Sequence, residues 1–221
     1  MKIALLSDIH GNLPALDAVL EDLPAVDAIV CAGDIVGYNP WPSECVDRIR
    51  ADADVVVEGN HDAAIKSPST FDANELAQAG VEYAAEMLSA EQKQWLETLP
   101  ESETIADGSF LVVHSHPTIR GKYVFPQEFP NLPRYLDDSR GIILGHTHIQ
   151  HATEIDDKII VNPGSVGQPR DADNRAAYAV LDTVNHTVDC RRVAYPVDRV
   201  IKEVERVGLP SKIGTRLRDG S

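Results

Sequence analysis

The feature that most constrains the fold is a regular alternation of short apolar runs and helical stretches near the start of the chain. Apolar runs occupy residues 2–7, 28–32 and 55–57, and stretches with helical spacing of apolar residues occupy residues 13–23 and 43–51. A strand, a helix and a second strand in this order form a βαβ unit, whose strands lie parallel and whose crossover is right-handed. The pattern therefore predicts an α/β fold with a parallel sheet and two crossover helices.

The rest of the chain changes from helical to strand-like patterns. Residues 72–99 are rich in Ala, Glu, Gln and Leu at helical spacing, and Ser89 is a cap that divides them into two helices. Residues 156–157 and 185–186 are typical of hairpin turns. The strands predicted after these helices cover residues 109–113, 141–144, 152–155, 158–161, 176–181 and 188–194.

Nothing in the sequence divides the chain into separate domains. Its 221 residues contain no Gly/Ser linker, internal repeat or low-complexity tract. A chain of this length buries about 70% of its unfolded surface without disulfide or metal staples. The longest irregular stretch, residues 115–134, carries four prolines. We therefore expect a single domain over residues 1–221 with one long functional loop.

Acidic residues outnumber basic residues. The chain has 35 Asp and Glu against 20 Lys and Arg, which gives a net charge of −15. A surface of this sign repels phosphate backbones unless bound cations reverse the charge locally, so binding of long nucleic acids is disfavoured. The same acid excess also suits a protein kept soluble in a very salty cytosol, where ions screen its self-repulsion.

Cysteine usage and hydropathy indicate the compartment. Cys31, Cys45 and Cys190 are odd in number and form no CxxC pair, which argues against both a disulfide framework and a thiolate metal site. The apolar run at the start is too short for a secretory signal, and no later run approaches the ~20 apolar residues of a membrane span. We therefore expect a cytoplasmic protein without a membrane partner.

Polar clusters follow five of the predicted strands. In open α/β sheets, ligands bind beyond the carboxyl ends of the strands, so these clusters should converge. Their oxygen and nitrogen donors without sulfur suit Mn²⁺, Fe²⁺ or Zn²⁺, and their number favours two metals that share a bridging carboxylate. The clusters are Asp8-Ile-His10, Gly33-Asp34, Gly59-Asn60-His61-Asp62, His114 and Gly145-His146-Thr147-His148.

This ordered set resembles the calcineurin-like metallophosphoesterases. The resemblance covers roughly residues 1–170, and the segment Asn162-Pro-Gly-Ser-Val-Gly-Gln-Pro-Arg170 is similar to the small bacterial and archaeal phosphodiesterase branch. It implies a four-layer α/β/β/α sandwich of two mixed sheets flanked by helices. It also implies that Asp34 bridges two metals, one held by Asp8, His10, Asp34 and His148 and the other by Asp34, Asn60, His114 and His146.

The same resemblance implies a mechanism. Two cations about 3.5–4 Å apart lower the pKa of a shared water, so that metal-bound hydroxide attacks phosphorus in line. His61 would donate a proton to the leaving oxygen or stabilise its charge, with Asp62 orienting the His61 ring. Because the ligand set mixes hard oxygen with imidazole, Mn²⁺ is the first metal we expect, with Fe²⁺, Ni²⁺, Co²⁺ and Zn²⁺ as alternatives.

One position departs from the family pattern. Glycine usually follows the fourth ligand, whereas Ser115, His116 and Pro117 follow His114 here. His114 and His116 would lie on one face of an extended segment. We assign His114 as the ligand, and His116 either faces the substrate or lies at the solvated rim.

Residues for substrate binding are less constrained. Arg170 is expected to counter a second phosphate, with Arg120 and Lys122 as weaker candidates. Several aromatic residues in or beside loops suit either an apolar wall for a nucleoside or aryl group or ordinary core packing. These aromatic residues are Tyr38, Trp41, Tyr123, Phe125, Phe129 and Tyr135.

The leading hypothesis is a phosphodiesterase or phosphatase that acts on a small phosphate ester. Dinucleoside polyphosphate hydrolysis and protein dephosphorylation are alternatives, because the same metal centre serves them. Some relatives of the fold, such as the retromer subunit, are protein-interaction modules with a degraded metal site. The complete set of ligand positions argues against that role here. Monomeric and homo-oligomeric states both stay open.

Overall fold

The chain forms two mixed β-sheets, which the computed structural model describes over residues 1–71 and 74–221. The first sheet consists of β1 (Lys2–Leu6), β2 (Ala28–Cys31), β3 (Val55–Val56), β9 (Ala176–Asp182) and β10 (Thr187–Val193). Their order across the sheet is β10-β9-β1-β2-β3. β1, β2 and β3 are parallel, as the βαβαβ pattern predicts, whereas β9 pairs antiparallel with both β1 and β10.

The second sheet has the order β4-β5-β6-β8-β7, with three parallel central strands and an antiparallel strand at each edge. It consists of β4 (Ser102–Ile105), β5 (Phe110–Val113), β6 (Gly141–Ile143), β7 (His151–Ile155) and β8 (Lys158–Asn162). β4 was not predicted, and only Ile105 of its four residues is buried. A strand with one buried side chain shows no apolar alternation.

The two sheets pack face to face over a shared apolar core. Along β1, Ile3 and Leu5 belong to the core between the sheets, whereas Ala4 and Leu6 pack on the other side, against helices. Successive side chains of a strand point to opposite faces, so a strand with both faces covered is apolar throughout. This burial explains the unbroken apolar run near the start of the chain.

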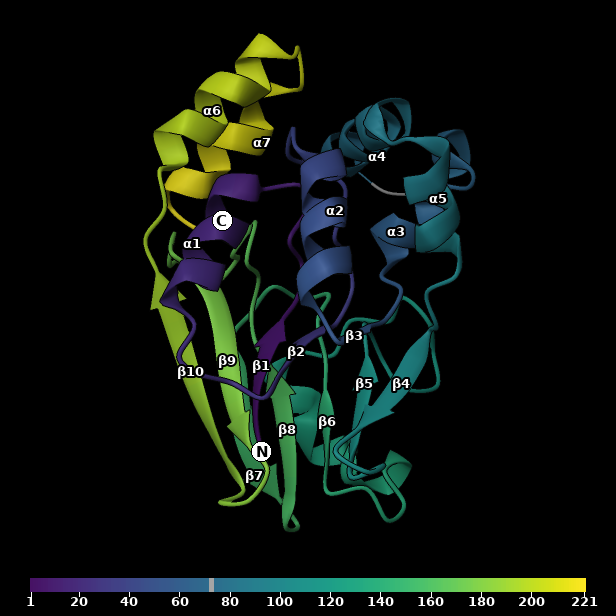
Figure 1. Ribbon diagram of the computed structural model, residues 1–221, viewed down its shortest axis with the longest axis vertical. Coiled ribbons are helices and arrows are strands. Elements are labelled where there is room, and N and C mark those ends of the chain that lie inside the picture. The colour runs from purple at the N-terminus through teal and green to yellow at the C-terminus, as the bar shows by residue number, and fades with distance from the viewer. Residues whose placement is uncertain (72–73) are drawn as a thin grey trace.

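Most helices lie toward one end of the sheets, in the upper half of Figure 1. The two crossover helices α1 and α2 cover the first sheet, as predicted. The long helices are α1 (Leu13–Asp22), α2 (Pro42–Asp52), α4 (Glu75–Met87), α5 (Ala90–Glu97) and α6 (Val197–Arg206). The short ones are α3 (Asn60–Ala64), α7 (Ser211–Thr215), η1 (Pro68–Thr70), η2 (Pro126–Asn131), η3 (Pro133–Tyr135) and η4 (Arg216–Arg218).

The two helices predicted in the middle of the chain are α4 and α5. Ser89 caps α5 as expected, because its hydroxyl accepts the Gln92 backbone N–H at 3.2 Å and the Gln92 side chain accepts the Ser89 N–H at 3.0 Å. The predicted range began at Asp72, but Asp72 and Ala73 lie outside the described residues. Within the described part, α4 starts after Asn74, whose side chain accepts two backbone N–H groups.

The outer face of the second sheet is covered by η2 and η3, which belong to the proline-rich stretch predicted as a loop. Phe129 and Leu132 pack there against Ile142 and Ile160 of the sheet. Proline lacks a backbone donor, which favours short 3₁₀ turns over a longer α-helix. The predicted four-layer α/β/β/α arrangement is therefore confirmed, with 3₁₀ helices as the fourth layer.

Among the helices that the structure describes, none has both the length and the apolar character needed to cross a membrane.

Candidate metal centre

The five polar clusters converge at the carboxyl ends of strands from both sheets. Asp8 follows β1, Asp34 follows β2 and Asn60 begins α3, while His114 follows β5 and His146 follows β6. Apart from Asn60, which is partly exposed, these residues are buried. Segments separated by up to 138 residues in the sequence therefore meet at one site.

Asp8, His10 and His148 form the first group of donors. Nε2 of His148 lies 3.2 Å from Asp8 Oδ1 and 3.1 Å from Nε2 of His10. Nε2 of His10 lies 3.7 Å from Asp8 Oδ1. All three residues are at most 2% exposed, so water does not shield these contacts.

The hydrogen bonds of His10 and His148 fix which ring nitrogen is free. Nδ1 of His10 donates to the carbonyl of Val36 at 3.0 Å, and Nδ1 of His148 donates to the carbonyl of Gln168 at 2.6 Å. Burial lowers the pKa of both imidazoles, so the rings are neutral and each Nε2 carries a lone pair. Two facing lone pairs repel unless a cation binds both, and this is how metal-binding histidines are oriented in proteins. The donor set therefore fits a metal ion.

Asp34, His114 and His146 form the second group. Nε2 of His114 lies 3.3 Å from Asp34 Oδ2 and 3.1 Å from the side-chain oxygen of Asn60. Nδ1 of His114 donates to the carbonyl of Ala32 at 2.8 Å, which again directs Nε2 into the site. In His146 the roles are reversed, because Nε2 donates to the carbonyl of Gly121 at 3.0 Å and leaves Nδ1 free.

Asp34 lies between the two groups. Its Oδ2 is 3.3 Å from Nε2 of His114 and 3.7 Å from Nε2 of His10. Burial lowers the pKa of His114, but the charge of Asp34, a hydrogen bond to Asp34 and the charge of Asp8 together raise it to about 10. Two buried carboxylates thus require a nearby positive charge, which a proton on His114 supplies when no cation does.

Backbone strain is concentrated at this site. The left-handed region costs non-glycine residues about 1–2 kcal/mol each, and such strain clusters at functional sites. Five of the predicted ligands adopt it: Asp8 (φ 53°), His10 (49°), Asp34 (56°), His146 (69°) and His148 (60°).

Two glycines are required by close approach rather than by flexibility alone. A Cβ atom on Gly59 would lie 2.1 Å from Oδ1 of Asp34, and one on Gly145 would lie 2.1 Å from the hydroxyl of Ser7. Both distances are far shorter than real Cβ contacts. These positions therefore need glycine so that the ligand loops can touch one another.

His61 lies beside the centre. Its backbone N–H donates to Oδ1 of Asp34 at 2.8 Å, and its ring makes edge contacts with His10, at 4.7 Å between centroids, and with Phe71 at 5.0 Å. Burial lowers the pKa of His61 to about 4. Its Nδ1 is buried and has no hydrogen-bond partner within the part of the chain that the structure describes.

The expectation that Asp62 orients the His61 ring is wrong. One Asp62 oxygen accepts the backbone N–H groups of Asp34 and Gly59, at 2.8 and 3.0 Å, and the other accepts those of Ile35 and Val36, at 2.9 and 3.2 Å. Burial and the charge of Asp34 raise the pKa of Asp62 to about 7. Asp62 thus fixes the backbone of the Asp34 loop, because both of its oxygens accept backbone N–H groups.

The end of β8 and the segment after it form hydrogen bonds that hold the loops of the centre in place. This role was not predicted from the sequence. The Ser165 hydroxyl donates to the carbonyl of Asp8 at 2.6 Å, and the Gly167 N–H donates to the same carbonyl at 3.0 Å. The side-chain amide of Asn162 donates to the carbonyl of Gly145 at 2.7 Å. The signal in the sequence that could have indicated this role is the run of Asn, Pro, Gly and Ser directly after an apolar strand.

Arg170 is near the centre but lies outside both donor groups. Its guanidinium donates to the Tyr38 hydroxyl at 3.2 Å and to the side-chain oxygen of Gln168 at 2.7 Å. After burial, its charge is the largest cause that lowers the pKa of His148. The Gln168 side-chain nitrogen is buried and unpaired among the described residues.

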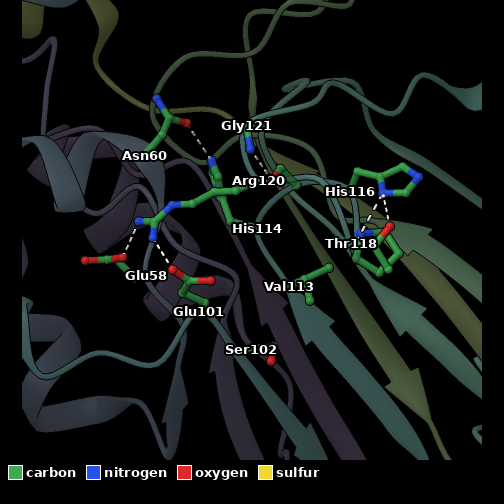
Figure 2. Close-up of a pocket in the computed structure, with 12 residues that line it drawn as sticks. Glu58, Asn60, Glu101, Ser102, Val113, His114, His116, Thr118, Arg120 and Gly121 are labelled. Atoms are coloured by element: carbon green, nitrogen blue, oxygen red, sulfur yellow. Dashed lines mark hydrogen bonds and ion pairs between the residues drawn. The ribbon is translucent and has the colours of Figure 1, made fainter. Parts of the chain in front are cut away.

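His114 and His116 point in different directions, as Figure 2 shows. His114 faces Asn60 and the centre, whereas His116 accepts the Thr118 backbone N–H at 3.2 Å and packs edge-on against Tyr135. His116 is therefore separated from the donor groups, although it lines the same cavity as His114.

The serine that departs from the family pattern contacts the centre indirectly. The Ser115 hydroxyl accepts the Gly121 N–H at 2.9 Å, and the Gly121 carbonyl accepts Nε2–H of His146. The Tyr123 ring stacks on His146 with 4.0 Å between centroids. Residues 115–123 thus orient one histidine of the centre.

The aromatic residues do not form one wall. Tyr38 is buried against His10 and His61, and Phe129 belongs to the core of the second sheet. Tyr123 and Phe125 are exposed and stack on each other at 5.9 Å. Trp41 and Tyr135 are partly buried and pack on two different apolar clusters.

The chain is similar to known proteins over a range that includes every residue of this site. The family described as "Calcineurin-like phosphoesterase superfamily domain" matches residues 1–186. An uncharacterized protein of Methanocaldococcus jannaschii, MJ0912, is 34% identical over 238 residues, which covers 97% of this chain and 96% of that protein. Phosphodiesterase YfcE of Escherichia coli is 28% identical over 194 residues, 82% of this chain and 88% of that protein. The crystal structure of a metallophosphoesterase from Sphaerobacter thermophilus is 35% identical with a TM-score of 0.87, covering 100% of this chain and 99% of that chain.

Proposed function

The chain belongs to the calcineurin-like phosphoesterase superfamily and is a metal-dependent phosphoester hydrolase, and from this premise we propose that it hydrolyses a small phosphodiester at a two-metal centre. The observation that supports the proposal most strongly is the position of Asp34 between two groups of imidazole and carboxylate donors. Similarity to a phosphodiesterase of Escherichia coli supports a diester over a monoester.

Each of the two donor groups would hold one cation. Asp8, His10 and His148 would hold one ion, Asn60, His114 and His146 the other, and Asp34 both. Mn²⁺ is the preferred ion, because oxygen and imidazole donors without sulfur suit it. When bound, the two cations would polarise the phosphoryl oxygens and lower the pKa of the water that attacks phosphorus.

His61 and Arg170 would act on the substrate itself. His61 is buried beside His10 with an unpaired Nδ1, so it can hydrogen-bond to the leaving oxygen and stabilise the charge that develops there. The Arg170 guanidinium would neutralise a phosphoryl oxygen, and Tyr38 holds it in place. Asp62 would act through the Asp34 loop, as a positioning residue.

A role as a protein-interaction module on the same fold is less favoured. Such a role gives no reason to keep two buried carboxylates and four buried imidazoles directed at one point, which is an electrostatically costly arrangement.

The test is hydrolysis of bis-p-nitrophenyl phosphate and p-nitrophenyl phosphate by metal-stripped protein reloaded with Mn²⁺, Ni²⁺, Co²⁺, Zn²⁺ or Mg²⁺. We expect turnover that requires metal, favours the diester and is lost in Asp34→Asn. A preference for the monoester would mean that the protein is a phosphatase and not a phosphodiesterase. Absence of hydrolysis with every metal would favour a role as a protein-interaction module.

A further inference from the structure

Two exposed aromatic rings continue outward from a histidine of the proposed metal centre. The Tyr123 ring is nearly parallel to the His146 ring, with an angle of 16° between the planes and 4.0 Å between the centroids. The Phe125 ring is nearly parallel to the Tyr123 ring, at 16° and 5.9 Å. His146 is 7% exposed, whereas Tyr123 and Phe125 are 45% and 37% exposed. A row of three rings thus leads from the buried centre to the surface.

Backbone hydrogen bonds hold both exposed rings in place. In the turn before Tyr123, the His116 N–H donates to the carbonyl of Lys122 at 3.2 Å. The Phe125 N–H donates to the Glu128 carboxylate at 3.1 Å, and the Glu128 N–H donates to the Phe125 carbonyl at 2.8 Å. Binding costs less when the groups that contact a ligand are already ordered. The two rings are therefore preorganised for a ligand that stacks on them.

The exposed aromatic surface is small. Aromatic side chains have about 150–250 Å² of surface, so the exposed parts of Tyr123 and Phe125 together amount to at most roughly 200 Å². A specific protein–protein interface needs roughly 500 Å² from each partner. The two rings therefore suit one flat ring system of a small molecule better than a partner protein.

We propose that Tyr123 and Phe125 form a stacking site for one planar ring of the substrate, and that this ring is the base of a nucleoside ester. Every base has a π-face, so aromatic side chains bind bases by stacking. Because Tyr123 contacts His146, a substituent of a phosphate held at the second donor group lies next to the rings. The inference rests on the proposed function, because it assigns a substituent to the ester that the metal centre hydrolyses.

The test is calorimetric binding of nucleoside monophosphates, the products of the proposed diester hydrolysis, to the Mn²⁺-loaded protein. Adenosine 5′-monophosphate is compared with ribose 5-phosphate, which lacks the base. Uridine 5′-monophosphate is compared with its 5,6-dihydro derivative, whose base keeps its hydrogen-bonding groups but is not aromatic. We expect the dissociation constant to be ~10-fold lower with the base in the first pair and ~3-fold lower with the aromatic base in the second, the scale of stacking one base. Equal dissociation constants within either pair would overturn the inference.

Phe125→Leu removes the outer ring and keeps an apolar side chain. In this variant we expect the preference for adenosine 5′-monophosphate over ribose 5-phosphate to fall by ~3–10-fold, whereas Phe125→Tyr should retain it. The matched control is Tyr83→Leu, since Tyr83 is a partly buried aromatic residue of α4 that packs on a different apolar cluster. An unchanged preference in Phe125→Leu, or an equal fall in Tyr83→Leu, would contradict the assignment.

Failure of the inference and failure of the proposed function give different results. If bis-p-nitrophenyl phosphate is hydrolysed but the paired ligands bind equally, only the stacking site is overturned. If no metal supports hydrolysis, the proposed function fails, and the order of affinities still decides the stacking site because binding does not require turnover. If neither the nucleotides nor inorganic phosphate bind, both fail.

Discussion

Each of the four imidazoles in the centre has one ring nitrogen bound to a backbone carbonyl, and this bond sets which nitrogen faces the other donors. His10, His114 and His148 use Nδ1 for the carbonyl and His146 uses Nε2. Such outer hydrogen bonds commonly change metal affinity by 10–100-fold when they are lost. We therefore expect the residues that hold these imidazoles to matter nearly as much for metal binding as the proposed ligands.

Ser115→Ala tests this dependence at the residue that departs from the family pattern. Without the Ser115 hydroxyl, the Gly121 N–H loses its acceptor and the carbonyl that orients His146 is less fixed. We expect the affinity for the more weakly bound Mn²⁺ to fall by ~10-fold, measured by calorimetry on metal-stripped protein. Ser102→Ala is the control, because Ser102 lines the same cavity at a different place. Equal losses in both variants would mean that the hydroxyl has no specific role.

His61→Ala tests the division between metal ligands and groups that act on the substrate. Because His61 would stabilise the leaving oxygen, we expect kcat to fall by about 10²-fold or more, the usual scale for losing an acid-base group. Metal content, measured by elemental analysis, should stay at the wild-type value. Loss of a metal ion in this variant would make His61 a ligand instead.

The convergence of the Asp, His and Asn clusters could be predicted from the sequence, because each cluster follows a predicted strand and the carboxyl ends of parallel strands meet at one edge of a sheet. The role of Asp62 could not be predicted, because a carboxylate two residues after Asn60 can face either the His61 imidazole or the backbone. Only the fold of the Asp34 loop brings four amides to it.

At the scale of elements, the predictable parts are those with a strong repeat. β1, β2, α1 and α2 follow from period and length, whereas β4 and α6 were missed. In β4 only one side chain is buried, so no alternation is visible. α6 was not predicted either, although Val200, Ile201 and Val204 lie at helical spacing and are buried, so this helix was readable from the sequence.

The capping box of α5 gives a test at this scale. In Ser89→Ala the Gln92 N–H loses its side-chain acceptor, and N-cap losses of this kind cost about 1 kcal/mol. We expect the urea midpoint to fall accordingly without a change in the m-value. Ser69→Ala, at an exposed serine of η1, should leave the midpoint unchanged. An equally large fall of the urea midpoint in Ser69→Ala would show that loss of the cap is not the cause.

At the scale of the whole molecule, the two sheets share one apolar core, and we propose that the chain is a single domain that unfolds in one transition. Its net charge of −15 opposes compaction through self-repulsion. Because salt shortens the screening length from about 10 Å at 0.1 M to about 3 Å at 1 M, stability should depend on ionic strength.

We therefore expect the urea midpoint of the metal-free protein to be higher in 1 M than in 0.05 M KCl, with a chelator present throughout. Fluorescence and circular dichroism should report the same transition. A midpoint that is unchanged or lower in high salt would show that self-repulsion does not limit stability, and two separate transitions would argue for two domains.

The most direct test of the central claim is the position of bound metal. Crystals soaked with Mn²⁺ and measured at its absorption edge locate the ions by anomalous scattering. We expect two ions, one contacting Asp8, His10 and His148 and the other contacting His114 and His146, with Asp34 bound to both. A single ion, or an Asp34 carboxylate bound to only one of two ions, would contradict the shared two-metal centre.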